Sequence, residues 1–119
     1  MADETKEIIK PVFLTYEGDR YELDFNRDSV RFAEQREFVL DEVLKYPVSK
    51  VPEFFFYAFR WHHKNLSREK TDKILEAMGG LTPKLTQRLI LLYQQAQMAN
   101  NLQEDEELEK NGAVTVEMD

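Results

Sequence analysis

Two stretches of the sequence hold side chains whose types and spacing could do chemistry. The first is His62-His63, which are the only two histidines of the chain. Adjacent residues on a helix point about 100° apart, so this pair cannot face one metal ion as i, i+4 histidines can. We therefore expect the two imidazoles to act as cations near the end of a helix, where they complement the helix dipole.

The second stretch is Asp24-x-Asn26-x-Asp28, whose spacing matches the opening of a calcium-binding EF-hand loop. Ser29 stands at the sixth position, where such loops need glycine, and Gln35 stands at the twelfth, where they need glutamate. Those two positions make the turn and supply the bidentate ligand. We therefore read this stretch as the end of a strand followed by a helix cap.

Nothing else in the sequence favours catalysis. The chain has no cysteine, which excludes disulfides, thiolate zinc sites and cysteine nucleophiles. It has no glycine-rich phosphate loop, and both Ser29 and Ser67 are explained as residues at helix starts. We expect no catalytic residues, no cofactor and no metal, and a protein that is not an enzyme.

The segment that must organise the core is aromatic and is predicted as a helix over residues 52–63. Pro52 is tolerated in the first turn, where its missing N–H would have no partner. At about 100° per residue the apolar side chains cover more than half of the circumference, so the helix is either sandwiched or covered by a second chain. A buried strand is the alternative. We expect the core to take Phe54, Phe55, Ala58 and Trp61.

The remaining elements indicate an α+β protein that is mostly α, with an N-terminal β-hairpin packed on a bundle of four to five short helices. Tyr21, Leu23 and Phe25 alternate with acidic residues, and the turn chemistry of residues 17–20 precedes them. Cap residues and Gly79-Gly80 mark helix ends. The predicted single domain, residues 11–100, has its hairpin at 11–25 and helices at about 27–37, 40–46, 52–63, 68–78 and 83–100.

Charge separates the domain from the end of the chain. Residues 1–100 hold 16 acidic and 15 basic side chains, whereas residues 101–119 hold 7 acidic and 1 basic. We expect residues 1–10 to be a flexible lead-in and 101–119 an acidic flexible tail. A near-neutral domain with an acidic tail disfavours nucleic acid and anionic membrane surfaces as partners. No apolar run approaches the roughly 18 residues needed to span a bilayer.

Four side chains are candidates for contact with a partner or with a second copy: Phe56, Arg60, Leu91 and Tyr93. Phe56 flanks the polar stripe formed by Glu53 and Arg60, so in a monomer we expect it to be exposed, as contact anchors are. The last predicted helix is apolar on every side over residues 89–93. That helix is therefore either central or in contact with a partner.

The order of these pieces resembles a known family. The hairpin ends in Tyr21-Glu22-Leu23-Asp24-Phe25, and the block Pro52-Glu53-Phe54-Phe55-Phe56-Tyr57-Ala58-Phe59-Arg60-Trp61-His62-His63 follows, before Ser67-Arg68-Glu69-Lys70-Thr71-Asp72-Lys73-Ile74-Leu75 and Met78-Gly79-Gly80-Leu81. Together they are similar to the tail assembly chaperones of siphophages and prophages of Gram-positive bacteria. The resemblance covers residues 12–98.

The resemblance implies a non-enzymatic function in the cytoplasm of the bacterial host. Such chaperones bind the tail tape measure protein and keep it soluble until tail-tube subunits polymerise around it, and they are absent from the mature virion. The implied partners are the tape measure protein, further copies of the chain itself in a homo-oligomer, and the major tail protein. Two alternatives remain, a small acidic phage inhibitor that mimics DNA and a structural adaptor of the virion.

Overall fold

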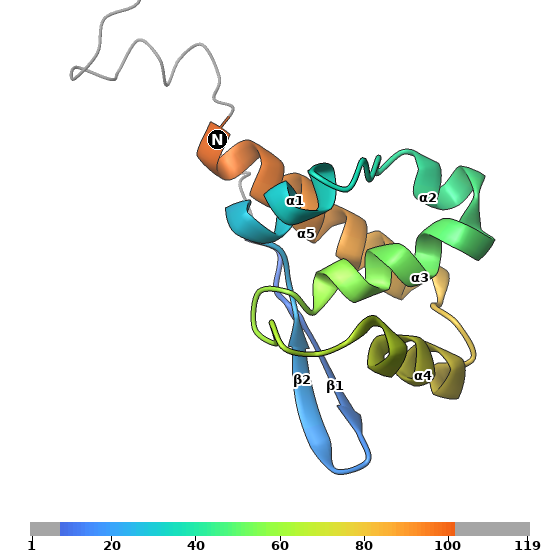
Figure 1. Cartoon of the computed structure of the whole chain (residues 1–119). Coiled ribbons are helices and arrows are strands. Elements are labelled where there is room, and N and C mark those ends of the chain that lie inside the picture. The colour runs from blue at the N-terminus through green and yellow to red at the C-terminus, as the bar shows by residue number, and fades with distance from the viewer. Residues whose placement is uncertain (1–7, 102–119) are drawn as a thin grey trace, which may run out of the picture.

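The computed structural model describes residues 8–101, with side chains through Met98. The predicted lead-in and acidic tail fall largely outside this part of the chain. A two-stranded hairpin is followed by five helices (Figure 1), which confirms the predicted α+β class. The elements are β1 (Val12–Tyr16), β2 (Asp19–Leu23), α1 (Arg27–Glu34), α2 (Glu42–Lys45), α3 (Pro47–Ala58), α4 (Arg68–Met78) and α5 (Pro83–Asn101).

The hairpin closes through a two-residue turn. The strands are antiparallel, with Tyr16 opposite Asp19, so Glu17 and Gly18 form the loop. Both loop residues have positive φ, at 52° and 85°, as the type I′ turn of a right-twisted hairpin requires. Alternate residues of β2 are buried, and the outer edge of β2 is tied to the helices because the N–H of Asp24 donates to the carbonyl of Ala58.

Most helix ends follow the predicted signals. Asn26 and Ser29 form a reciprocal capping box at the start of α1, and Ser67 accepts a hydrogen bond from the N–H of Lys70 at the start of α4. Gly79, at φ 76°, ends α4 in the left-handed conformation. The predicted bounds 68–78 are confirmed, and α5 ends one residue beyond its predicted limit.

The aromatic helix is shifted relative to the prediction. It begins at Pro47 instead of Pro52, so Pro52 lies inside the helix, and it ends at Ala58 instead of His63. Pro47 suits the first helical position as well as Pro52 does, and the carbonyl of Tyr46 accepts a bond from the N–H of Lys50. At the other end, the carbonyl of Ala58 accepts a hydrogen bond from the N–H of Asp24. The next two residues form turns in which the N–H donates to the carbonyl three residues earlier.

The first two predicted helices are shorter than expected. Helix α1 ends at Glu34, because Glu37 takes a left-handed conformation at φ 62° and the N–H of Phe38 turns back to the carbonyl of Ala33. This arrangement is a Schellman-type end with a non-glycine residue in the strained position. Helix α2 has only four residues, and its predicted stop before Pro47 is confirmed.

The core is a stack of aromatic rings around Phe54. Its ring lies between Phe25 and Phe38, at centroid distances of 5.4 and 5.6 Å and nearly parallel to both, while the Tyr93 ring meets it nearly edge-on at 6.0 Å. The core positions predicted for Phe54, Phe55 and Ala58 are confirmed, since all three are fully buried. The prediction for Trp61 is wrong: it lies beyond the end of α3 and is 39% exposed.

Candidate functional site

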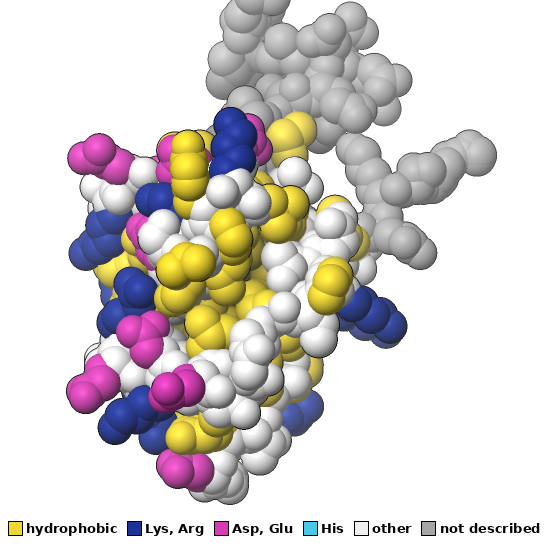
Figure 2. Space-filling view, turned by 90° about the vertical axis from the view of Figure 1, so that its right-hand side faces the viewer, with side chains coloured by type: hydrophobic (Ala, Val, Ile, Leu, Met, Phe, Trp, Pro, Cys, Tyr) yellow, Lys and Arg dark blue, Asp and Glu magenta, His cyan; other side chains and the backbone are white. Residues whose placement is uncertain are grey.

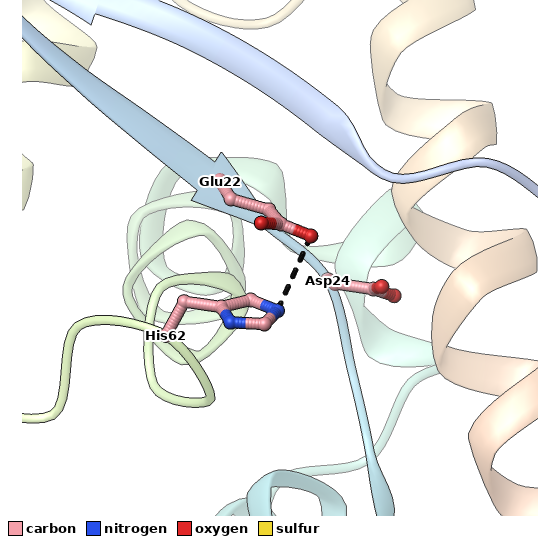
Figure 3. A group of neighbouring side chains, drawn as sticks. All are labelled: Glu22, Asp24 and His62. Atoms are coloured by element: carbon pink, nitrogen blue, oxygen red, sulfur yellow. Dashed lines mark ion pairs between the residues drawn. The ribbon is translucent and has the colours of Figure 1, made fainter.

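The only described group of titratable side chains that could hold a metal ion lies where β2 meets the segment after α3. Glu22 lies on β2 and Asp24 directly after it, and His62, from the segment after α3, points toward the Glu22 carboxylate (Figure 3). One ligand atom from each lies within 4.8 Å of the others. Two carboxylates and an imidazole are chemically able to bind a divalent cation.

These side chains already have protein partners. His62 Nε2 lies 3.3 Å from a carboxylate oxygen of Glu22, and Asp24 Oδ1 accepts a 2.8 Å hydrogen bond from the N–H of Phe25. Burial raises the pKa of Asp24 above its usual range, and the hydrogen bond from Phe25 partly opposes that shift. The group is therefore accounted for as a structural contact between the hairpin and the α3–α4 connection.

The second histidine has a separate role from the first. His63 Nε2 accepts a 2.9 Å hydrogen bond from the N–H of Glu22, so it caps the outer edge of β2 in its neutral form. Burial, and next the charge of His62, lower the pKa of His63 below its usual range. The expected role of the pair as helix-end cations is wrong, because α3 ends at Ala58 and His63 acts as a hydrogen-bond acceptor.

The calcium-like spacing of Asp24, Asn26 and Asp28 is explained by local structure, as expected from the residues at positions 29 and 35. Asn26 Oδ1 accepts from the N–H of Ser29 at 2.9 Å, and Ser29 Oγ accepts from the N–H of Asn26 at 2.8 Å. Asp28 is exposed and pairs with Arg31 on the surface. The stretch is a strand end and a helix cap.

Two of the predicted contact residues, Phe56 and Arg60, lie together on a mixed surface that also includes Phe32 and Arg36. We call this set the arginine–aromatic surface. The guanidinium carbons of Arg36 and Arg60 lie 3.5 and 3.8 Å from the centroid of the Phe32 ring, and the Phe56 ring lies 6.4 Å from the same centroid. Phe56 is half-buried by these contacts and not fully exposed as expected.

The other two predicted contact residues, on α5, are less accessible. Tyr93 is only 1% exposed and packs edge-on against Phe25, Phe38 and Phe54, so the prediction that it contacts a partner is wrong for this fold. Burial raises the pKa of its hydroxyl to about 12. Leu91 is half-buried, and its proposed contact with a partner stays a prediction.

Four exposed large apolar side chains lie elsewhere, around α2 and the first turn of α3. Val39, Leu44, Tyr46 and Val48 are 48, 71, 58 and 91% exposed, and we call them the apolar corner. Figure 2 shows hydrophobic side chains gathered on the face that carries these elements. This surface was not among the predicted contact sites, because Val39 and Leu44 stand next to the core residues Phe38 and Val43 in sequence and have the same apolar character. A signal was present in the alternation of Leu44, Tyr46 and Val48 beside Pro47.

The geometry defines a small α+β domain, mostly α, whose core is aromatic. The family model described as a domain of unknown function (DUF5055) matches residues 1–118, so the chain belongs to that family. No curated protein and no solved structure matches it. No helix in the described part of the chain is both long and apolar enough to cross a membrane.

Proposed function

We propose that the chain is a non-enzymatic assembly chaperone of a long-tailed bacteriophage. In this proposal it binds the tape measure protein in the host cytoplasm and keeps that protein soluble until the tail tube forms around it. The observation that carries the proposal is the apolar corner, in which Leu44 and Val48 are 71% and 91% exposed. A long amphipathic helix presents an apolar stripe that a surface of this kind can cover.

The size of the corner fits a client that must later be released. A stable interface buries about 800 Å² on each partner, more than four side chains provide. One contact would therefore be weak, and several copies bound along one client would hold it by multivalency. Copies arranged in this way would leave as tail-tube subunits of the major tail protein replace them, and none would remain in the mature virion.

The test is co-expression of the full chain with the tape measure protein of the same phage or prophage. We expect the chain to raise the soluble fraction of the tape measure protein, and the double variant Leu44→Asp/Val48→Asp to lose this effect. Ile8→Asp is the matched control, because Ile8 is 82% exposed and lies outside the corner. Equal solubility with the parent chain and the double variant would overturn the proposal.

The alternatives predict different results. A DNA mimic needs rows of excess carboxylates on the folded surface, but residues 1–100 hold 16 acidic and 15 basic side chains, and the acidic excess lies in residues 101–119. A structural adaptor would be found by mass spectrometry in purified particles, whereas a chaperone would be missing from them. Detection at a fixed copy number per particle would favour the adaptor.

A further inference from the structure

The arginine–aromatic surface places two cations against one ring. Arg36 and Arg60 lie 3.5 and 3.8 Å from the centroid of Phe32, close enough for cation–π contact. A guanidinium that stacks on a ring keeps its N–H donors in the plane of the group, where they can meet a carboxylate. One N–H of Arg36 already donates a 3.1 Å hydrogen bond to the carbonyl of Phe32. The remaining donors form a preorganised site for an acidic group.

Within residues 8–98 neither arginine has an acidic partner. The ion pairs of this part of the chain join other side chains, including Arg31 with Asp28 and Arg68 with Asp72. Arg36 is exposed and Arg60 is half-exposed, so both can be reached from solvent. Two stacked guanidinium groups without a carboxylate partner in the described structure are suited to an acidic polypeptide segment.

The chain itself carries a segment of that chemistry. Residues 104–109 read Glu-Asp-Glu-Glu-Leu-Glu, which places five carboxylates in six positions, while residues 1–100 are nearly neutral. This segment begins three residues after Asn101, where α5 ends. The charge of the surface and the charge of the segment are therefore complementary.

The chain after Asn101 is also long enough to reach from the end of α5 to Arg36. The last turns of α5 lie beside α1, since Gln97 and Met98 line one surface hollow together with Arg27 and Arg31. Arg36 follows α1, and the eight residues of that helix rise about 12 Å. An extended chain covers roughly 3.3 Å per residue, so three to eight residues beyond Asn101 span about 10–26 Å.

We propose that the acidic segment of residues 104–109 binds the arginine–aromatic surface of its own chain, with its carboxylates accepting hydrogen bonds from Arg36 and Arg60. Attachment through a short linker gives the segment a millimolar effective concentration at this surface, which favours the same chain over a second copy. Phe56 and Arg60 would then be covered until salt or a competing acidic partner displaces the segment. This inference does not depend on the chaperone proposal.

The test uses the full chain and its lack of cysteine. A nitroxide on the single introduced cysteine of Asn111→Cys should broaden the NMR signals of the Phe32 amide and of the Arg36 and Arg60 side chains. The broadening should be lost at about 1 M salt, where the Debye length is about 3 Å. It should also be lost when the five acidic residues of 104–109 are changed to Gln or Asn, a change that leaves the described fold untouched.

Three results would overturn the proposal. The first is the absence of broadening at this surface at low salt. The second is broadening that survives both high salt and the neutralised segment. The third is broadening seen only when spin-labelled ¹⁴N chains are mixed with unlabelled ¹⁵N chains, because the segment would then bind a second copy. Arg36→Gln/Arg60→Gln is the matched change on the other side and should abolish the same signal while the remaining amide spectrum is retained.

Discussion

The two halves of α3 both carry large apolar side chains but differ in what covers them. Val48, in the first turn, is 91% exposed, whereas Phe54 and Ala58, in the second half, are fully buried. The second half meets rings from three other parts of the chain, while the first turn follows directly on the four-residue α2 and leaves Val48 open to solvent. Burial therefore follows from the available neighbours and not from hydrophobicity alone.

The comparison separates stability from binding. Side chains that are already buried contribute to the free energy of unfolding, and exposed apolar side chains contribute chiefly when a partner covers them. We expect substitutions in the second half of α3 to alter stability and those in the apolar corner to alter binding.

The largest effect is expected from Phe54→Ala. Removing a ring stacked between Phe25 and Phe38 leaves a cavity at the centre of the core, and we expect a loss of about 3–5 kcal/mol in the free energy of unfolding. Chemical denaturation measures the loss. Val48→Ala is the control and should change stability by no more than about 0.5 kcal/mol. Equal losses from the two substitutions would remove the distinction between the two halves.

A smaller loss is expected from Tyr57→Phe. The Tyr57 hydroxyl donates a 2.7 Å hydrogen bond to Glu53, and burial together with that bond raises the pKa of Tyr57 well above its usual range. A hydrogen bond to a charged acceptor contributes about 1.5–3 kcal/mol, and Lys50 still pairs with Glu53 in the variant, so we expect a loss of about 1–2 kcal/mol. Tyr46→Phe, in the exposed corner, should be neutral by the same measurement.

A gain in stability is expected from Glu37→Gly, at the point where the chain leaves the core for the corner. Glu37 has φ 62°, a left-handed conformation that glycine adopts without a steric penalty. We expect thermal and chemical denaturation to show a gain of about 0.5–1 kcal/mol. Lys73→Gly, at an exposed position inside α4, should instead lose about 1 kcal/mol, and a gain there would contradict the explanation.

The smallest effect concerns pH. The pKa of His63 is lower in the folded chain than its unfolded value near 6.5, so the unfolded state binds more protons between the two values. This histidine should therefore reduce stability as the pH falls from 7 through the folded pKa. His63→Gln keeps an acceptor for the N–H of Glu22 but does not titrate. Denaturation at several pH values should show a weaker pH dependence for this variant than for the parent.

The parts of the fold that could be predicted depend on local chemistry. The hairpin turn, the Asn26 and Ser67 caps and the Gly79 helix end are each specified by neighbouring residues, and all are present. The bounds of α3 depend on distant groups. Two prolines in the segment both suit a helix start, and the end at Ala58 is set by a hydrogen bond from Asp24.

The candidate surfaces were only partly predictable for the same reason. Phe56 and Arg60 do reach the surface, but their stacking with Phe32 depends on the packing of α1 on α3. The helical pattern could not show that Tyr93 faces the aromatic stack. Exposure of Leu44 and Val48 depends on the absence of a covering element in the described chain, which no local pattern records.

Pro52 gives the apolar corner a physical property of its own. Because proline has no N–H, the carbonyl of Val48 lacks the hydrogen bond that an uninterrupted helix would supply four residues on. The first turn of α3 is therefore held by fewer backbone hydrogen bonds than the turns that carry the core rings. Its amides should exchange with deuterated solvent sooner than theirs. A surface that can loosen at little cost while the aromatic stack stays rigid can adjust to the differing side chains of successive turns of a helix.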